Sequence, residues 1–339
     1  MRICLLTRYF NFSYAGIGRF SVEIRNRLEK SGYEIKEVSC SHGFSNYFGY
    51  VFYTAFEIPV MLSHCDIYHA LSPMEGVWIP KDKSVVTFHD LIPWLYPDKM
   101  SAGQTGSVMN KLGSSILRKY FKFTCDLAKR ARFIACDSQQ TRDEVIQHLQ
   151  IPPERTLVIK LGIREDLEPQ DKPDTMLRFG YLGQLDRRKR VNLLIEAFLD
   201  ASADGELVIA GTGKEEAALK DLAGDNKRIK FLGFVPDEKL TDFYNSLNYF
   251  IFPTQIEGYG LPIVEAMACQ KPVVVLADAI IPQEIKSRCT IVDRLNDFFT
   301  NPANKCNVSE NYQFAKEHTW ERCIKAYLEL YKKIYAETA

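Results

Sequence analysis

Short apolar runs alternate with amphipathic stretches along most of the chain. The runs are rich in β-branched and aromatic residues, which is typical of strands buried on both faces of a parallel sheet. We expect strands at residues 2–7, 34–39, 66–70, 84–88, 132–136, 157–160, 177–182, 207–210, 249–252 and 273–276. Helix-period segments lie between them, for example at 19–30, 139–149 and 191–199. This alternation predicts an α/β protein built on parallel sheets.

The chain has 339 residues, enough for two domains that each bury a core. Residues 165–174 are polar, contain two prolines and show no periodicity, as expected of a linker. We therefore predict a first domain at 1–165, a linker at 166–176 and a second domain at 177–316. Residues 317–339 contain a final helix with an apolar stripe between 320 and 335.

The most informative stretch is 250–276, which reads as strand, loop, helix and strand. Gly258 and Gly260 lie in the turn, and Pro262 suits the start of a helix because its missing N–H would have no partner there. The free N–H groups of such a turn and the helix dipole favour an anion. The sequence therefore predicts an anion site at this turn.

Two carboxylates border this turn. Glu265 is the only charged residue between 261 and 269, in a segment apolar on every side, so its charge needs hydrogen-bond donors. Glu257 stands just before the helix, where both side chains can reach the carboxyl end of the strands. Alternatively, Glu265 pairs with an internal Arg or Lys and Glu257 is a solvated loop residue.

The spacing from Glu257 to Glu265 resembles the E-x7-E signature of the retaining glycosyltransferases of family GT4. That resemblance implies the GT-B fold, with two Rossmann-like doubly wound domains facing a cleft and a C-terminal helix crossing back to the first domain. It also implies that Glu257 contacts the donor sugar and Glu265 the nucleotide ribose. The intervening residues Gly258, Tyr259, Gly260 and Leu261 would then bind the donor.

Further motifs resemble the donor side of the same family. Gly183 to Lys189 is similar to its G-R-x-x-x-R-K loop, in which Arg188 and Lys189 would hold the donor diphosphate. Gln184 replaces the usual Arg and removes one charge, which Arg187 or Arg190 could partly replace. A solvated charge run is the alternative for this loop. Phe234 and Val235 match the segment that lies against the base.

Motifs in the first half of the chain resemble the acceptor-side motifs of the same family. His89 and Asp90 follow the strand 84–88, and the carboxylate beside the imidazole can orient it. They resemble the family's HD-L-x-P segment, which implies an active-site role for His89. Gly16, Gly18 and Arg19 form a loop similar to G-I-G-R-[YF], expected to approach the donor phosphates and the acceptor.

The resemblance implies a metal-independent hexosyltransferase without a cofactor, which moves a sugar from a nucleotide-diphosphate sugar to a saccharide or lipid-linked saccharide. No D-x-D triplet suggests a metal clamp. The HD-L-x-P and E-G-[FY]-G-L-P patterns resemble those of mannosyltransferases of surface polysaccharides, which implies GDP-mannose as the donor. A GT-B sugar-nucleotide epimerase and a non-catalytic nucleotide-sugar-binding subunit are the alternatives. A dehydrogenase is disfavoured because Ser21 occupies the last glycine position of G-x-G-x-x-G.

Composition limits the partners. Lys plus Arg and Asp plus Glu are both 43, which gives no reason to expect a nucleic-acid partner. Nine scattered cysteines without C-x-x-C spacing and the absence of a signal-peptide pattern predict a cytoplasmic protein. Residues 101–132 carry seven basic residues and one acid among apolar positions. This stretch predicts either a solvated helix or a peripheral contact with anionic lipid on the inner face of the membrane.

Overall fold

The computed structural model describes residues 1–10, 15–40, 47–97, 99, 108–171, 176–201, 204–303 and 305–338. The chain forms two compact units, each built on a six-stranded sheet in which every pairing is parallel. The first unit comprises Met1–Pro97, Gln104–Gly162 and Trp320–Ala339, and the main segment of the second is Ile163–Thr319. The expected α/β class is confirmed.

The first sheet has the strand order β2-β1-β3-β4-β5-β6. Its strands are β1 (Arg2–Leu6), β2 (Glu34–Val38), β3 (Ile67–Ala70), β4 (Ser84–Phe88), β5 (Phe133–Cys136) and β6 (Thr156–Val158). This is the flavodoxin-like order with one further strand. Successive strands are added toward one edge up to β2 and toward the other edge from β3 on, so the strand order reverses between β1 and β3. Every residue of β3, β4 and β5 is buried, which explains their continuous apolar runs.

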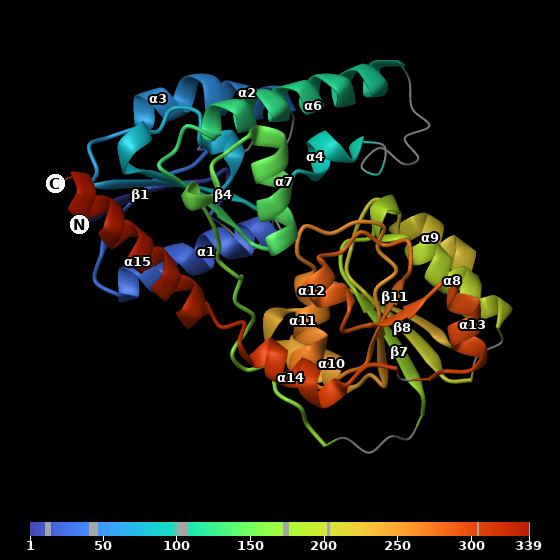
Figure 1. The fold of residues 1–339 in the computed structure, drawn as a ribbon. Coiled ribbons are helices and arrows are strands. Elements are labelled where there is room, and N and C mark those ends of the chain that lie inside the picture. Colours follow the sequence, from blue (N-terminus) through green and yellow to red (C-terminus); the bar gives the residue numbers. More distant parts are fainter. Residues whose placement is uncertain are drawn as a thin grey trace. The chain divides into compact units, whose positions relative to one another are not determined.

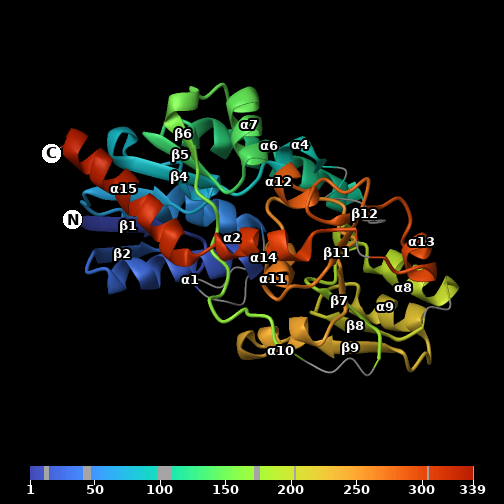
Figure 2. The same cartoon turned by 60° about the horizontal axis from the view of Figure 1, so that its bottom comes forward.

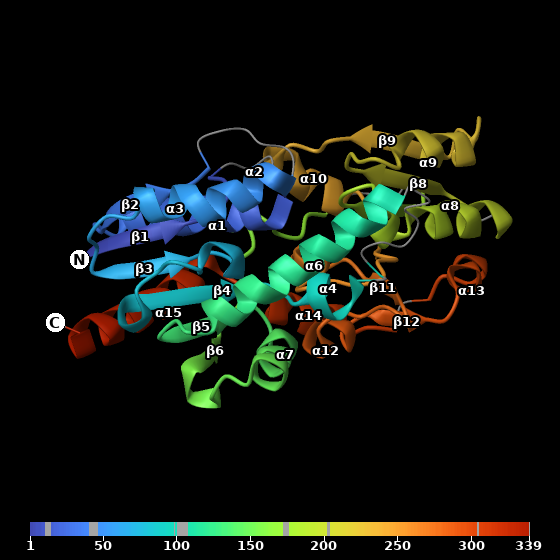
Figure 3. The same ribbon diagram turned by 90° about the horizontal axis from the view of Figure 1, so that it is seen from above.

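Helices cover both faces of the first sheet, with α1 and α15 on one face and α2, α3 and α6 on the other (Figures 1 and 3). The α-helices are α1 (Ala15–Lys30), α2 (Tyr47–Phe52), α3 (Ile58–Met61), α4 (Ile92–Leu95), α6 (Val108–Ala128), α7 (Gln139–Leu149) and α15 (Trp320–Thr338). The shorter turns are the π-helix η1 (Tyr53–Glu57) and the 3-10 helices η2 (Pro73–Glu75), η3 (Lys81–Lys83) and η4 (Pro153–Arg155).

The C-terminal helix α15 is an integral part of the first unit (Figure 2). The Tyr331 hydroxyl lies 2.6 Å from Nδ1 of His69, and the Tyr327 hydroxyl lies 2.9 Å from Oγ1 of Thr87. All these side chains are buried, and burial lowers the pKa of His69 to about 3, so this imidazole is neutral. A polar network inside the core thus fixes the seat of α15.

The second sheet has the order β12-β11-β10-β7-β8-β9. Its strands are β7 (Arg178–Leu182), β8 (Glu206–Ala210), β9 (Ile229–Gly233), β10 (Tyr249–Ile251), β11 (Val273–Leu276) and β12 (Thr290–Val292). This is the Rossmann order, in which the strand order reverses between β7 and β10. Ligands of open α/β sheets bind at the carboxyl ends of strands at such a reversal.

The helices of the second unit also form two layers, with α8, α9 and α13 on one face and α10, α11 and α14 on the other (Figure 1). They are η5 (Arg187–Lys189), α8 (Val191–Asp200), α9 (Glu216–Ala223), η6 (Asp237–Lys239), α10 (Leu240–Asn245), α11 (Leu261–Ala268), α12 (Gln283–Lys286), α13 (Leu295–Thr300) and α14 (Val308–Lys316).

The predicted linker segment is attached to the second unit over its described part. Leu167 is buried, and Asn245 binds the backbone on both sides of Pro169, donating to Glu168 O and accepting from Gln170 N. Residues 172–175 lie outside the described residues. Over the described part of the chain, no helix combines the length and the apolar character that a membrane crossing requires.

Candidate functional site

Glu257 is the centre of an ion-pair cluster at the reversal of the second sheet. Its Oε1 accepts hydrogen bonds from Lys189 Nζ at 2.6 Å, Arg188 Nη1 at 3.2 Å and Thr254 Oγ1 at 2.5 Å. The Glu257 side chain is only 11% exposed. Burial opposes its ionisation, but the Lys189 and Arg188 cations outweigh burial and hold the pKa of Glu257 below its ordinary value. Glu257 is therefore an ionised residue held by cations, and the alternative in which it is a solvated loop residue does not hold.

Local structure fixes both cations. Asp186 caps the turn η5 by accepting from the Lys189 N–H at 3.1 Å. Arg188 Nη1 also donates to Ile256 O at 2.7 Å, and Lys189 Nζ lies 4.9 Å from the centre of the Phe252 ring. Arg188 and Lys189 are balanced by Glu257 and by Asp186, whose Oδ2 lies 3.9 Å from Arg188 Nη2. The cations at this turn are thus held in place by carboxylates.

Arg190 holds the loop that carries Glu257. Its Nε donates to Pro253 O and its Nη2 to Thr254 O, and both terminal nitrogens bind the Asp278 carboxylate at 2.7 and 2.9 Å. Four of its five N–H groups are therefore engaged. These contacts give Arg190 a structural role in the loop and leave it little capacity to replace the charge that Gln184 lacks.

Several polar groups beside the cluster are available to a ligand. Among the described residues, no donor reaches Oε2 of Glu257, and no acceptor takes the N–H groups of Gly258, Gly260 and Leu261. Gly260 has φ +93°, a left-handed conformation that turns the loop into the start of α11. The helix begins at Leu261, one residue before the predicted start at Pro262.

Glu265 is buried in α11 with 4% of its surface exposed, as its apolar neighbours predict. The Tyr244 hydroxyl, from α10, donates to Oε2 of Glu265 at 2.8 Å. A tyrosine thus supplies one of the donors that a buried carboxylate needs. The carboxylate is held one helical turn into α11, beyond the loop of Glu257.

The Gly183 loop packs directly against the loop that follows β8. A side chain at Gly211, which has φ +121°, would place its Cβ 1.8 Å from Gly183 O. Only glycine permits this approach of two backbones. Gln184 is exposed, with its carbonyl bonded to the Tyr181 hydroxyl at 2.9 Å. The structure therefore brings Gly183, Arg188, Lys189 and Glu257 together at the ends of β7 and β10.

Phe234 and Val235 directly follow β9, at the edge of the same sheet. The Phe234 side chain is 72% exposed and Val235 is half-buried. An exposed aromatic ring at the carboxyl end of a strand is free to stack on a planar ligand. Its expected role against the nucleotide base stays a prediction.

His89 is the centre of a separate polar cluster in the first unit. Its Nδ1 lies 2.6 Å from Oδ2 of Asp137, its Nε2 lies 2.9 Å from Leu71 O, and the Phe20 ring packs edge-on at 4.9 Å. Asp90, expected to orient His89, accepts a hydrogen bond from Ile92 N at 2.9 Å in the turn before α4. The orienting carboxylate is Asp137, because β5 pairs with β4 and ends beside it.

The two partners of His89 define its charge. A backbone carbonyl and a carboxylate both accept, so both ring nitrogens donate, and only an imidazolium has two N–H groups. Burial alone would lower the pKa of His89, but the Asp137 carboxylate, with a smaller contribution from Asp90, raises it above the ordinary value. His89 is thus built to carry a positive charge.

Gly16, Gly18 and Arg19 lie in the first turns of α1, which begins at Ala15. The expected loop is therefore wrong for Gly16 and Gly18, and the helix starts four residues earlier than the predicted start at Arg19. The Thr7 and Ser21 hydroxyls lie 2.9 Å apart and join the end of β1 to the helix. The glycines thus stand at a helix N-terminus beside the reversal of the first sheet, where backbone N–H groups favour an anion.

Sequence reasoning missed four residues that build these clusters: Asp137, Tyr244, Asp186 and Asp278. Each lies far in the sequence from its partner or acts through a backbone cap. Asp137 alone left a signal, because it follows a buried strand that predictably lies beside the strand before His89.

Both halves of the chain match family models. Residues 14–167 match the model described as Glycosyltransferase Family 4, and residues 162–297 match Glycosyl transferases group 1. Together the two matches cover most of the chain in the order of its two units. The chain belongs to the group 1, family 4 glycosyltransferases, as its motifs predict.

Individual relatives agree with this assignment. The chain is 23% identical to the O-antigen chain mannosyltransferase B of Escherichia coli, over 98% of this chain and 100% of that protein. It also matches a serotype-specific mannosyltransferase WbdA of the same species at 28% identity, but over 60% of this chain and 28% of that longer protein.

Solved structures show the same fold. A sucrose-phosphate synthase of Thermosynechococcus elongatus superposes with a TM-score of 0.76 at 16% identity, over 99% of this chain and 100% of that one. HepE of Anabaena, in a complex with UDP-glucose, gives a TM-score of 0.70 at 17% identity, over 98% and 100%. The GT-B fold is therefore confirmed.

Proposed function

We propose that this protein is a retaining, metal-independent hexosyltransferase that uses a nucleotide-diphosphate sugar bound on its second unit. The observation that carries the proposal is the cluster in which Arg188 and Lys189 hold the ionised Glu257 at the reversal of the sheet. The cluster combines cations for a diphosphate, a carboxylate for sugar hydroxyls and free N–H groups within one loop system.

Each group has a role in the proposed reaction. Glu257 is anchored through Oε1, and its Oε2 would accept a hydrogen bond from a hydroxyl of the donor sugar. Charge grows on the departing diphosphate, and Arg188, Lys189 and the N–H groups of Gly258 to Leu261 would stabilise it. Glu265, held by the Tyr244 hydroxyl, would accept hydrogen bonds from the ribose hydroxyls. On the first unit, His89 would supply a fixed positive charge, and Gly16, Gly18 and Arg19 would approach phosphate and acceptor.

The proposed donor is GDP-mannose, and the acceptor is a saccharide or lipid-linked saccharide of a surface polysaccharide. The similarity to the O-antigen chain mannosyltransferase B over the full length of both chains supports mannose. A thermal-shift panel of GDP, UDP, ADP and dTDP tests the base, because a nucleotide at 100 times its dissociation constant stabilises the protein by about 2.7 kcal/mol. A larger shift with UDP than with GDP would refute GDP-mannose.

We also propose that the enzyme works at the inner face of the cell membrane, where a lipid-linked acceptor would be reached. Apolar side chains stand exposed on α2, η1, α3 and α6 and on the loop after η2: Phe52, Phe56, Val60, Trp78, Ile116 and Phe123. The elements that carry them contact one another, because Trp78 Nε1 donates to Thr54 O at 2.8 Å and the hydroxyls of Thr54 and Tyr120 are bonded. We call these six side chains the exposed apolar surface.

Cations flank this exposed apolar surface on α6. Arg118, Lys119 and Lys122 are exposed, whereas the side chains of 108–114 and all of 101–107 lie outside the described residues. Aromatic rings and cations on one face match the interface of a membrane with anionic lipids. The expected basic amphipathic helix is thus present as α6 over Val108–Ala128.

A further inference from the structure

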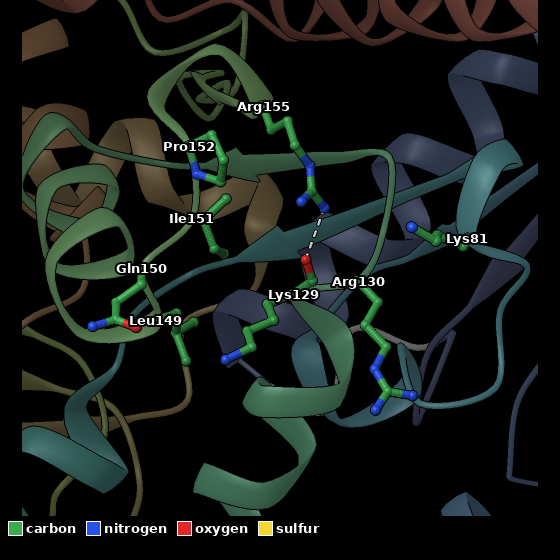
Figure 4. Close-up of a pocket in the computed structure, with 8 residues that line it drawn as sticks. All are labelled: Lys81, Lys129, Arg130, Leu149, Gln150, Ile151, Pro152 and Arg155. Atoms are coloured by element: carbon green, nitrogen blue, oxygen red, sulfur yellow. Dashed lines mark hydrogen bonds between the residues drawn. The ribbon is translucent and has the colours of Figure 1, made fainter.

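A hollow of about 290 Å³ lies at the amino ends of β4, β5 and the edge strand β6 of the first unit. Its lining includes Lys81 before β4, Lys129 and Arg130 before β5, and Arg155 before β6. Figure 4 shows these four cationic side chains around the hollow. His89 stands at the opposite end of β4, roughly 15 Å away for a five-residue strand. The hollow is therefore separate from the His89 cluster.

Arg155 is held rigidly at the rim of this hollow. Its Nη2 donates to Lys129 O at 2.8 Å (Figure 4). Its Nη2 also donates to Ala131 O, and its Nε donates to Arg132 O at 3.4 Å. These bonds satisfy carbonyls at the end of α6, whose partial negative charge would otherwise repel an anion. Over the described residues, Nη1 of Arg155 donates to no group, so part of the guanidinium remains for a ligand.

Two of the other three cations lack a competing carboxylate. Lys129 makes an exposed pair with Asp126 at 3.3 Å, but neither Lys81 nor Arg130 has an acidic side chain within ion-pair distance in the described part of the chain. The floor is apolar, formed by the buried Leu149 and Ile151. Four cations around one hollow with an apolar floor create a positive potential there, which an anion would neutralise.

We propose that this hollow binds a phosphate group. A phosphate presents oxygens in several directions, which suits cations that line one hollow from three separate segments. Arg and Lys bind phosphate through charge-assisted hydrogen bonds. The phosphate would belong either to a small soluble ligand or to a lipid headgroup. The site is distinct from the proposed donor site on the second unit.

Calorimetry with inorganic phosphate tests the proposal in the full chain. The double variant Lys81→Ala/Arg130→Ala removes two exposed, unpaired cations, so the fold is expected to persist, which a thermal melt checks. Phosphate affinity should fall about tenfold or more. The matched control Lys325→Ala/Lys332→Ala removes the same charge from the exposed side of α15 and should bind as the wild type does.

The variants also separate the two sites and the two sources of phosphate. Absent phosphate binding, or binding that is lost in Arg188→Ala but kept in Lys81→Ala/Arg130→Ala, would overturn the proposal. A lipid headgroup is indicated if phosphate competes with vesicles of phosphatidylcholine containing phosphatidic acid and the double variant weakens vesicle binding. A soluble ligand is indicated if phosphate affinity falls in the double variant but vesicle binding is unchanged.

Discussion

The Nδ1 atom of His89 lies 2.6 Å from Oδ2 of the buried Asp137, while its Nε2 lies 2.9 Å from the carbonyl of Leu71. The imidazole therefore donates on both sides and is not free to take a proton from an acceptor hydroxyl. A fixed imidazolium acts through its charge, for example on a developing negative charge, without proton transfer.

Replacing Asp137 should change the charge of this imidazole. In Asp137→Asn, the pKa of His89 should fall below its raised wild-type value, because the carboxylate that favours the charged form is gone and burial now dominates. Titration of the His89 ring by NMR measures this directly. An unchanged pKa would show that Asp137 does not control the charge of His89.

The same pair predicts a pH dependence of stability. The pKa of His89 is raised in the folded protein, so the pair stabilises the fold fully below the unfolded value of about 6.5. This contribution is lost as pH rises through the folded pKa. The difference in free energy of unfolding between wild type and Asp137→Asn should therefore shrink with rising pH. A difference that grows with pH would contradict the assignment.

Glu265→Ala should weaken nucleotide-diphosphate binding. A carboxylate that accepts ribose hydroxyls makes charge-assisted bonds worth roughly 1.5 to 3 kcal/mol, so affinity should fall about tenfold or more. Tyr244→Phe removes the 2.8 Å bond to the carboxylate and is the matched control for loss of positioning, with a smaller expected effect. Calorimetry that gives wild-type affinity for a folded Glu265→Ala would mean that Glu265 has only a structural role.

The two cations beside Glu257 should differ on mutation. Arg188→Ala leaves Glu257 bound by Lys189 and Thr254, so the fold should persist while turnover falls by about a hundredfold through lost stabilisation of the diphosphate. Binding of the bare nucleoside should hardly change. Lys189→Ala removes the closer and more buried cation but leaves Glu257 bound by Arg188 and Thr254, so it should cost less than the roughly 3 to 5 kcal/mol of a fully broken buried pair.

Steady-state kinetics and nucleoside calorimetry on Arg188→Ala decide this point. If nucleoside binding and turnover fall by the same factor, Arg188 does not act on the diphosphate. Chemical denaturation measures the cost of Lys189→Ala.

The exposed apolar surface predicts salt-sensitive membrane binding. Charge reversal at Arg118, Lys119 and Lys122 should reduce co-sedimentation with acidic vesicles and leave nucleotide affinity intact, because surface charges are screened beyond about 8 Å at physiological ionic strength. Phe56→Ser, which alters a ring that is 63% exposed, should weaken binding independently of salt. Reversal at Lys325 and Lys332 on α15 is the control. If vesicle binding does not change with salt, with the charge reversals or with Phe56→Ser, this surface does not contact the membrane, which would favour a soluble acceptor.

Much of the fold could be predicted from the sequence because buried parallel strands leave uninterrupted apolar runs. The predicted strands 84–88 and 273–276 coincide with β4 and β11. The strand β12 (Thr290–Val292) was not predicted, because it is short and only its first residue is buried. The start of α1 was misplaced because Gly16 and Gly18 suggest a loop wherever tertiary packing is unknown.

The candidate site was predictable only where its parts are close in sequence. Two compact motifs contain the predicted residues Arg188 and Lys189, and Glu257 and Glu265. In the structure, Glu257 binds both Arg188 and Lys189. The carboxylate of His89 could not be assigned in the same way. Asp90 is adjacent in sequence, but its carboxylate binds Ile92 N in the turn before α4. Asp137, which follows the neighbouring strand β5, binds His89 instead.

The most direct test is proton NMR of a reaction containing GDP-mannose, a mannose-terminated acceptor and EDTA. The proposed chemistry predicts one α-linked mannosyl product for each GDP released, with no release when the acceptor is omitted and a loss of product in Arg188→Ala. A β-linked product, a requirement for added metal, or GDP release without acceptor would contradict a retaining, metal-independent transferase.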